Sequence, residues 1–322
     1  MTTAAPTLKT SIAYPKGQIT LREVGLRDGL QMVDKFPSTQ GKLDWLALEY
    51  AAGMRHFELG TFLPTDRYPM FGDLELLIAK AMEYPDLHGA ALVPNKRGAM
   101  DAFASGVSEL HCVISASEEH NQANLNRSCA DSLTEIRQII ELRNSRHPET
   151  TIGVGIAMSF GCSISGEVAP NLVLTLAENL YEIGADIVSL ADTVGYAGPK
   201  QVEHLAREMY SLASGRPFGI HLHDTRGLGL ANASAALGQG VSMLDASLGG
   251  LGGCPAAPKA TGNIVMEDLV FLCQTAGFDT GIDLEKLLLT REVLKREMPA
   301  QPLYGALAMA GLPKIGNTVA NT

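Results

Sequence analysis

Two histidines placed two positions apart are the clearest chemical signal in this sequence. His221 and His223 lie in "GIHLHDTRG" (219–227), inside an apolar stretch with the length of a strand. Side chains at positions i and i+2 of a strand point to the same face, so both imidazoles should project together. One buried histidine is usually a hydrogen-bonded core residue, but a same-face pair at a strand end favours a metal site. Asp224 follows directly, and we expect it to orient a neighbouring ligand.

Polar side chains also stand at the ends of several other predicted strands. Taken singly, each has an ordinary explanation, such as a surface ion pair, a solvated loop acid or a helix N-cap. Taken together, they place acids, an arginine, imidazoles and an amide on one rim. These residues come from "EVGLRDGLQ", "HFELGTF", "SLADTVG" and "SLGGLGGCPAAPKATGN", and are Arg27, Asp28, Glu58, Ser189, Asp192, Thr193, Cys254 and Asn263.

Four of the rim residues form a mixed oxygen and nitrogen donor set without a thiolate. These are Asp28, His221, His223 and Asn263. Such a set suits an octahedral Mg²⁺ or Mn²⁺ that keeps positions open for substrate. A closed structural zinc site is disfavoured, because such sites are usually rich in cysteine. Cys254 instead stands alone in the glycine-rich "GGLGGCP", where we expect an exposed and movable thiol. The alternative is a small residue in a glycine turn.

The order of predicted elements positions this rim. Eight short apolar runs alternate with helical patterns, which is the count of a (β/α)₈ barrel. A doubly wound sheet is the competing architecture, but no G-x-G-x-x-G motif follows the first strand. The strands are expected near 19–26, 56–62, 89–94, 109–114, 152–160, 186–192, 218–224 and 242–250. The helices are expected near 40–53, 72–83, 96–105, 130–143, 170–183, 199–213, 228–239, 264–276 and 284–297.

These elements predict a single TIM-barrel catalytic domain over residues 19–300, with an extra C-terminal helical segment. We expect residues 1–18 to be a flexible N-terminal leader without the apolar run of a secretory signal. Residues 301–322 should be a C-terminal tail.

Composition narrows the classes of partner. The 322 residues carry a net charge of −10, which disfavours nucleic acid and anionic membranes as partners. No apolar run is long enough for a membrane helix. The five cysteines form no C-x-x-C pair, so we expect free thiols and a cytoplasmic location.

The motifs together resemble the 3-hydroxy-3-methylglutaryl-CoA lyase family of metal-dependent TIM-barrel lyases. The resemblance covers roughly residues 19–296, and the glycine-flanked cysteine is specific to the lyase branch. The matching stretches, in order, are "EVGLRDGLQ", "FELGTF", "LVPNKRG", "SASEEHNQANLNRS", "SLADTVG", "HLHDTRG" and "GGLGGCPAAPKATGN".

The resemblance implies a reaction and a role for each rim residue. A divalent cation on Asp28, His221, His223 and Asn263 would chelate the substrate's tertiary hydroxyl, and Asp28 or His221 would remove its proton. The carbon–carbon bond would break to a ketone or keto acid and the enolate of acetyl-CoA. Arg27 would stabilise the enolate oxygen, and Cys254 would protonate the enolate carbon. Glu58 and Asp192 would position groups or relay protons. Substrate contacts are expected from Arg27, Gln31, Thr61, Ser189 and Arg226.

The chain departs from the family pattern on its rim loops. The family's Asn-Glu-Lys after "RDGLQ" is "MVDK" (32–35) here, and its Gly-Cys-Pro-Tyr-Glu-Gly is "GCSISG" (161–166). Thr61 stands where the family has serine. Arg226 adds a positive charge after the histidines, which could pair an additional acid or a CoA phosphate.

These departures suggest that the acyl group differs from methylglutaryl. Met32, Val33 and Ile164 could line a more apolar pocket. Two alternatives remain beside the lyase. One is a condensing synthase of the isopropylmalate synthase type, which shares the Arg-Asp-Gly and His-x-His motifs, and the other is an inactive barrel that binds a partner. The resemblance also implies a homo-oligomer, a dimer or larger.

Overall fold

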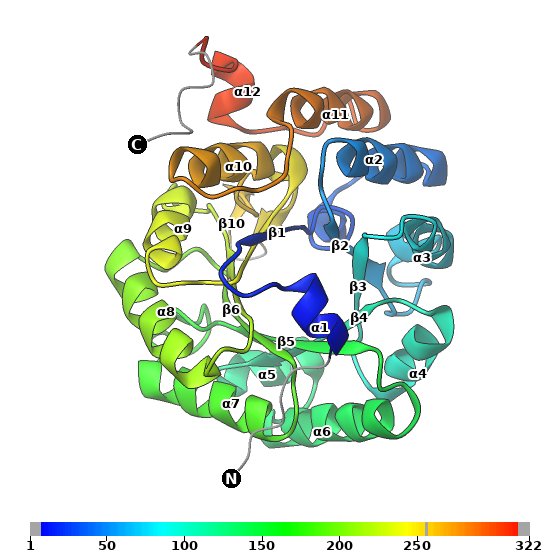
Figure 1. Ribbon diagram of the computed structural model, residues 1–322. Helices are drawn as coiled ribbons and strands as arrows, with labels where there is room; N and C mark the ends of the chain where they lie inside the picture. Colours follow the sequence, from blue (N-terminus) through cyan, green and yellow to red (C-terminus); the bar gives the residue numbers. More distant parts are fainter. Residues whose placement is uncertain (1–7, 255–256, 315–322) are drawn as a thin grey trace.

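A closed parallel barrel forms the centre of the computed structural model, which describes residues 8–254 and 257–314. Within that part of the chain, eight strands pair in sequence order and β8 pairs with β1 to close the ring (Figure 1). The prediction of a TIM barrel is therefore confirmed. The strands are β1 (Thr20–Glu23), β2 (His56–Thr61), β3 (His88–Leu92), β4 (Glu109–Ser115), β5 (Thr151–Ala157), β6 (Ile187–Asp192), β7 (Phe218–Leu222) and β8 (Met243–Ala246).

A helix follows each barrel strand and covers the outside of the ring (Figure 1). Serine and asparagine side chains begin several of these helices by accepting a backbone N–H, as Ser38 does from Gly41 and Asn95 from Gly98. These outer helices are α2 (Thr39–Ala51), α3 (Leu74–Met82), α4 (Lys96–Ser105), α6 (Cys129–Arg146), α7 (Pro170–Glu182), α8 (Pro199–Ala213), α9 (Gly229–Leu237) and α10 (Met266–Thr275).

The expected elements differ from the observed ones mainly at the barrel rim. Helix α5 (Glu118–Leu125), which begins after β4, was not predicted. Strand β1 ends at Glu23 rather than at 26, because the N–H groups of residues 27–29 all turn back to the carbonyl of Val24. Strand β8 ends at Ala246 rather than at 250, where the chain enters the short helix η3 (Leu248–Gly250) with Gly249 and Gly250 at positive φ.

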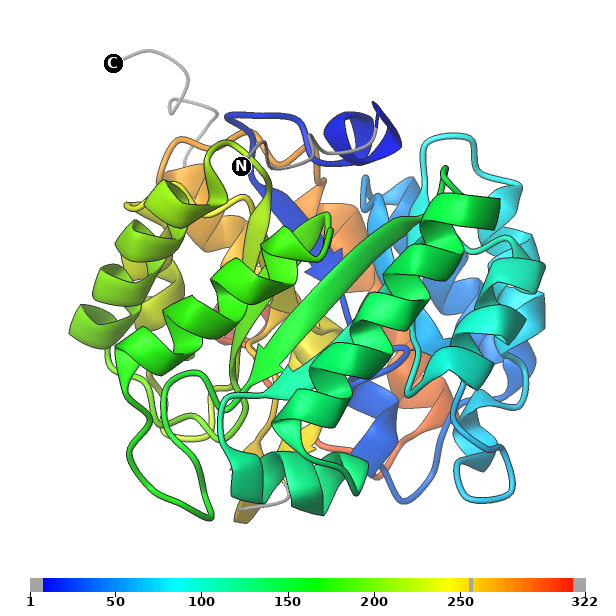
Figure 2. The same cartoon turned by 90° about the horizontal axis from the view of Figure 1, so that it is seen from below.

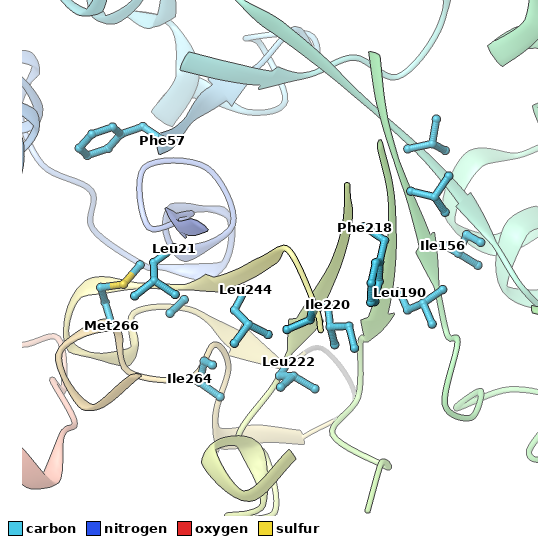
Figure 3. Packing of buried hydrophobic residues seen from close by; sticks show 14 of the residues in the cluster. Leu21, Phe57, Ile156, Leu190, Phe218, Ile220, Leu222, Leu244, Ile264 and Met266 are labelled. Atoms are coloured by element: carbon cyan, nitrogen blue, oxygen red, sulfur yellow. The ribbon is translucent and has the colours of Figure 1, made fainter. Parts of the chain in front are cut away.

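Alternation along the strands separates an apolar outer face from a polar lumen. Leu21, Leu190, Ile220 and Leu244 are buried in the hydrophobic cluster between the strands and the helices (Figure 3). The neighbouring residues on the same strands point the other way, and the lumen holds charged and polar groups such as Arg22. TIM-barrel interiors are usually filled by branched apolar side chains, so this polar lumen is distinctive.

The segment before the first strand closes the N-terminal end of the barrel, where we had expected a flexible leader. Helix α1 (Leu8–Ala13) lies across that end (Figure 2). The hydroxyl of Thr10 is 3.0 Å from that of Thr151, and the Tyr14 hydroxyl donates to Glu109 at 2.7 Å. The buried Glu109 carboxylate needs donors, and the Tyr14 hydroxyl is one of them, which fixes this segment in place.

Two further helices follow the last barrel helix, and the first of them was predicted. Helix α11 (Leu284–Glu297) packs against α2, and α12 (Ala306–Ala310) lies outside α10 and α11 (Figure 1). The Asp268 carboxylate accepts the N–H groups of Ala306 and Leu307, which anchors α12 within the segment expected to be a tail. Among the described residues, no helix has the length and apolar character needed to cross a membrane.

Candidate active site

Three of the four predicted metal ligands converge at the C-terminal end of the barrel. One donor atom each from Asp28, His221 and His223 lies within 4.8 Å of the other two. Asp28 comes from the compact turn after β1, which is held by hydrogen bonds to Val24. His221 lies in β7, and His223 follows directly after its last residue. His221 and His223 point to the same face, with ring centroids 5.0 Å apart, as their spacing predicted.

The fourth predicted ligand reaches the cluster through the loop after β8. Asn263 forms a β-bridge with His223, and the N–H of Asp224 donates to the carbonyl of Gly262 at 2.8 Å. The Asn263 side-chain amide donates to Asp28 at 2.9 Å and to the carbonyl of Leu251 at 3.1 Å. Its Oδ1 atom is buried and has no hydrogen-bond partner among the described residues.

This donor set fits a divalent cation. A buried amide oxygen without a partner is costly unless something accepts its lone pairs. A carboxylate, two imidazoles and an amide oxygen are also the donors that Mg²⁺ and Mn²⁺ accept in proteins. Burial opposes ionisation of Asp28, but Arg27 and the two histidines outweigh it and hold the pKa of Asp28 well below its ordinary value. Asp28 is therefore an anion at neutral pH, as a ligand must be.

A carboxylate that the sequence analysis missed orients one of the histidines. Asp245 on β8 lies 3.1 Å from the Nδ1 atom of His221. Burial raises the pKa of Asp245, but Arg22 and His221 lower it further, so Asp245 is ionised and accepts a hydrogen bond from Nδ1–H. This leaves Nε2 of His221 with a free lone pair for a ligand bond, as in carboxylate–histidine–metal arrangements.

The Arg22 guanidinium binds the Asp245 carboxylate inside the barrel lumen. It donates from Nε and Nη2 to the two oxygens of Asp245, both at 2.9 Å, and from Nη1 to Glu109 at 3.2 Å. All three side chains are buried. The sequence signal for them was a charged residue inside an apolar strand run, as in "ITLREVGL" and "SMLDASLGG", which identifies a polar position but not its partner.

Arg27 joins three other predicted site residues. Its Nε donates to Glu58 at 2.7 Å, and its Nη1 donates to Asp28 at 2.7 Å and to Gln31 at 3.4 Å. Glu58 is buried and its Oε1 has no hydrogen-bond partner in the described part of the chain. The guanidinium is thus fixed beside the cluster of Asp28 and the two histidines, between the carboxylates of Asp28 and Glu58.

A cavity of about 280 Å³ opens beside this cluster. Predicted site residues line it, namely Arg27, Asp28, Gln31, Thr61, Ser189, Thr193, His221 and His223. The Ser189 hydroxyl is buried and has no hydrogen-bond partner among the described residues, so it is available to a ligand. His111 and, from the unpredicted helix α5, His120 and Asn124 also line the cavity. Met32 lines the cavity as expected, but Val33 and Ile164 lie outside it.

Three other charged residues that the sequence analysis names form hydrogen bonds with backbone groups of nearby loops and do not line the cavity. The Asp192 carboxylate accepts the N–H groups of Tyr196 and Ala197, and burial raises its pKa. Asp224 accepts the N–H of Gly229 at the start of α9. The Arg226 guanidinium donates to the carbonyls of Val194 and Gly195, so its charge points to the loop after β6. The roles proposed for Asp192 and Arg226 in substrate handling remain predictions.

The cysteine loop returns to the cavity as a short hairpin of β9 (Gly253–Cys254) and β10 (Ala257–Thr261). Gly253 lines the cavity, which places the backbone of Cys254 next to it. Gly252 has φ 136°, and a Cβ there would lie 2.9 Å from the Asn263 amide nitrogen, so the close approach requires glycine. The Cys254 side chain, Pro255 and Ala256 lie outside the described structure.

Known proteins resemble this chain over most of its length. The family model described as HMGL-like matches residues 18–294. The hydroxymethylglutaryl-CoA lyase of Bacillus subtilis is 35% identical over 286 residues, covering 88% of this chain and 94% of that protein. The (R)-citramalyl-CoA lyase of Chloroflexus aurantiacus is 36% identical over 303 residues, covering 91% and 95%. A solved HMG-CoA lyase from Acinetobacter baumannii, in complex with coenzyme A and 3-methylmalate, is 34% identical with a TM-score of 0.85, covering 100% of this chain and 99% of that chain.

Proposed function

The chain belongs to the HMGL-like family, and from this premise we propose that it is a carbon–carbon lyase that cleaves a 3-hydroxyacyl-CoA thioester. The observation that carries the proposal is the convergence of Asp28, His221, His223 and Asn263 beside the cavity. The relatives are named as lyases of hydroxymethylglutaryl-CoA and of citramalyl-CoA, which supports cleavage rather than condensation.

These four residues would hold a divalent cation, Mg²⁺ or Mn²⁺. When bound, such a cation lowers the pKa of a hydroxyl and offsets negative charge that develops beside it. Asp245 and Arg22 fix the orientation of His221, and Arg27 and Asn263 fix that of Asp28, so the donors are arranged before any ligand arrives.

The protein's own groups supply the proton transfers and the charge stabilisation. His221 or Asp28 accepts the proton of the substrate's tertiary hydroxyl. His221 would use Nε2 as a ligand and Nδ1–H toward Asp245, whereas the Asp28 carboxylate keeps lone pairs beside its hydrogen bonds from Arg27 and Asn263, which favours Asp28 as the base. The hydroxyl oxygen becomes the ketone oxygen as the carbon–carbon bond breaks, and the bonding pair moves into the thioester as an enolate.

Arg27 and Cys254 complete the reaction in this proposal. The Arg27 guanidinium is held by Glu58 and Asp28 where it would stabilise the enolate oxygen. The Cys254 thiol then protonates the enolate carbon, which gives acetyl-CoA and a ketone or keto acid. The backbone of Cys254 follows Gly253 at the cavity wall, which supports this assignment.

Incubation with a panel of 3-hydroxyacyl-CoA thioesters tests the proposal. The panel comprises 3-hydroxy-3-methylglutaryl-CoA, citramalyl-CoA and a 3-hydroxy-3-alkylglutaryl-CoA with a longer alkyl group, each with Mg²⁺ or Mn²⁺. We expect equal amounts of acetyl-CoA and the matching carbonyl compound from at least one thioester. If intact thioester is recovered from every member, while coenzyme A still binds, the chain is a binding protein and the proposal is wrong.

A further inference from the structure

His111 is a polar residue of the cavity that has no role in the proposed reaction. It lies on β4, is 7% exposed and lines the cavity. Its Nδ1 atom lies 3.4 Å from Nη1 of Arg22. Arginine can only donate, so Nδ1 of His111 is the acceptor and the ring proton of the neutral side chain stands on Nε2.

The Nε2 atom is held over a glycine of the neighbouring strand. A Cβ built on Gly155 of β5 would lie 2.9 Å from Nε2 of His111, so any other residue there would push the ring away. Gly155 itself lines the cavity. Among the described residues, Nε2 of His111 has no hydrogen-bond partner. The structure therefore presents one N–H donor to the cavity from a fixed ring.

Ser189 repeats this arrangement on the next strands. It is the register partner of Gly155, and a Cβ on Gly219 of β7 would lie 2.7 Å from the Ser189 hydroxyl oxygen. The hydroxyl is buried without a partner in the described part of the chain. His111 on β4 and Ser189 on β6 thus each present to the cavity a polar group without a hydrogen-bond partner among the described residues, and Gly155 of β5 lies between them.

These groups stand at the inner end of the cavity. Directly behind His111 lies Arg22, which is 1% exposed, and behind Arg22 lies the fully buried Glu109. A cavity of about 280 Å³ is too small for a coenzyme A moiety, so a thioester must enter acyl group first. The end of the acyl group farthest from sulfur then meets His111 and Ser189.

We propose that His111 is a specificity-determining residue whose Nε2–H donates a hydrogen bond to an oxygen at the far end of the acyl group. The residue thus selects thioesters with a carboxylate or hydroxyl at that end over those with an alkyl group. This inference rests on the proposed function, because it assumes that the cavity receives an acyl-CoA.

The state of the ring supports this role. Burial and the adjacent Arg22 charge lower the pKa of His111 to about 4. The imidazole is therefore neutral near pH 7 and offers a single donor in one tautomer. A buried donor that meets an alkyl group would remain without a partner, which is the usual physical basis of strong discrimination by polar sites.

The preference for a polar end group is tested with three unreactive thioesters of equal chain length. Glutaryl-CoA, 5-hydroxypentanoyl-CoA and pentanoyl-CoA differ only in their end group, and all lack the 3-hydroxyl that cleavage needs. Their dissociation constants are measured by calorimetry on the full chain with excess Mg²⁺. Coenzyme A alone is the fourth ligand. Failure of the proposed function appears as absence of cleavage in the panel assay, whereas failure of this inference appears as equal changes in binding of the three thioesters, so the two failures are distinguishable.

His111→Ala and His111→Gln give opposite expectations. We expect H111A to weaken binding of glutaryl-CoA or 5-hydroxypentanoyl-CoA about tenfold or more, and to change pentanoyl-CoA binding less than threefold. Which of the two oxygen ligands responds identifies carboxylate or hydroxyl. H111Q keeps an N–H at the Nε2 position and should restore most of the affinity. If each variant changes the dissociation constants of all three thioesters by the same factor, the inference is wrong. Melting curves show whether each variant is folded.

Discussion

The Nδ1 atom of His221 lies 3.1 Å from a carboxylate oxygen of Asp245, and the two residues come from neighbouring strands. The same carboxylate receives two hydrogen bonds from the buried Arg22. A histidine of the candidate metal site is thereby linked to charged groups in the barrel lumen. The orientation of His221 is set by residues that touch neither the substrate nor the proposed cation.

Asp245→Asn should weaken cation binding by about 10- to 100-fold, because the neutral amide no longer fixes the Nδ1–H tautomer of His221. Isothermal titration with Mn²⁺ measures the change. Glu109→Gln is the matched control, since it also removes a charged partner of Arg22 but does not contact His221. Equal Mn²⁺ affinity in D245N and the unmodified protein would show that the pair has no part in metal binding.

Arg27→Lys should lower kcat by about a hundredfold and weaken Mn²⁺ binding much less, because lysine keeps the charge and Asn263 still donates to Asp28. Lysine keeps the charge but loses the planar fork that contacts Glu58 and Asp28 together, so the donor no longer faces the enolate oxygen. The measurement is the acetyl-CoA release rate at saturating substrate. An unchanged kcat would remove Arg27 from the proposed chemistry.

Cys254→Ser should reduce acetyl-CoA formation by about a hundredfold or more, because a serine hydroxyl is a much weaker acid than a thiol. Bound metal, determined by elemental analysis, should stay at the level of the unmodified protein. Cys129→Ser serves as the control, since this half-buried thiol donates to the Ser115 carbonyl and does not line the cavity. Similar losses in both variants would argue against a catalytic thiol.

Glu23→Gln should stabilise the protein more at pH 8.5 than at pH 5.5. Burial raises the pKa of Glu23 from an ordinary value of 4.5 to about 8, with Glu267 adding to the effect. The stability contributed by the protonated acid is complete below about pH 4.5 and is lost as the pH rises through 8. Glutamine cannot ionise and can still accept from the N–H groups of Gly25 and Leu248.

Melting temperatures of E23Q and the unmodified protein, measured at pH 5.5 and pH 8.5, test whether the stabilisation is larger at the higher pH. Hydrogen bonding and charge from His88, together with the Arg22 charge, outweigh burial and lower the pKa of Glu109 to about 2. Glu109→Gln should therefore change the melting temperature by the same amount at pH 5.5 and 8.5. If the melting temperatures of E23Q and the unmodified protein differ by the same amount at pH 5.5 and at pH 8.5, Glu23 is not protonated in the folded state.

The parts of the site that the sequence predicted depend on local rules. The two-residue period of a strand was sufficient to place His221 and His223 on one face. The barrel architecture then predicted that Asp28 and Asn263, from other strand ends, would lie beside them, and the structure shows that they do.

The parts that the sequence did not predict depend on pairings between distant segments. Barrel closure places Arg22 of β1 against Asp245 of β8, although 223 positions separate them in the chain. His111 reaches the cavity only because β5 carries a glycine at position 155. The sequence also did not predict that Asp192 and Asp224 accept backbone N–H groups of a turn and of a helix start, because an acid with this role has the same sequence context as a catalytic one.

Acetyl-CoA release after cation removal and titrated return decides whether cleavage depends on a bound divalent cation. The protein is stripped with EDTA, and 3-hydroxy-3-methylglutaryl-CoA or citramalyl-CoA is supplied while Mg²⁺ or Mn²⁺ is added in steps. We predict that the stripped protein is inactive, and that acetyl-CoA release rises with bound cation until about one ion is bound per chain. Full activity in the stripped protein, or no acetyl-CoA from either thioester at any cation concentration, would contradict the account.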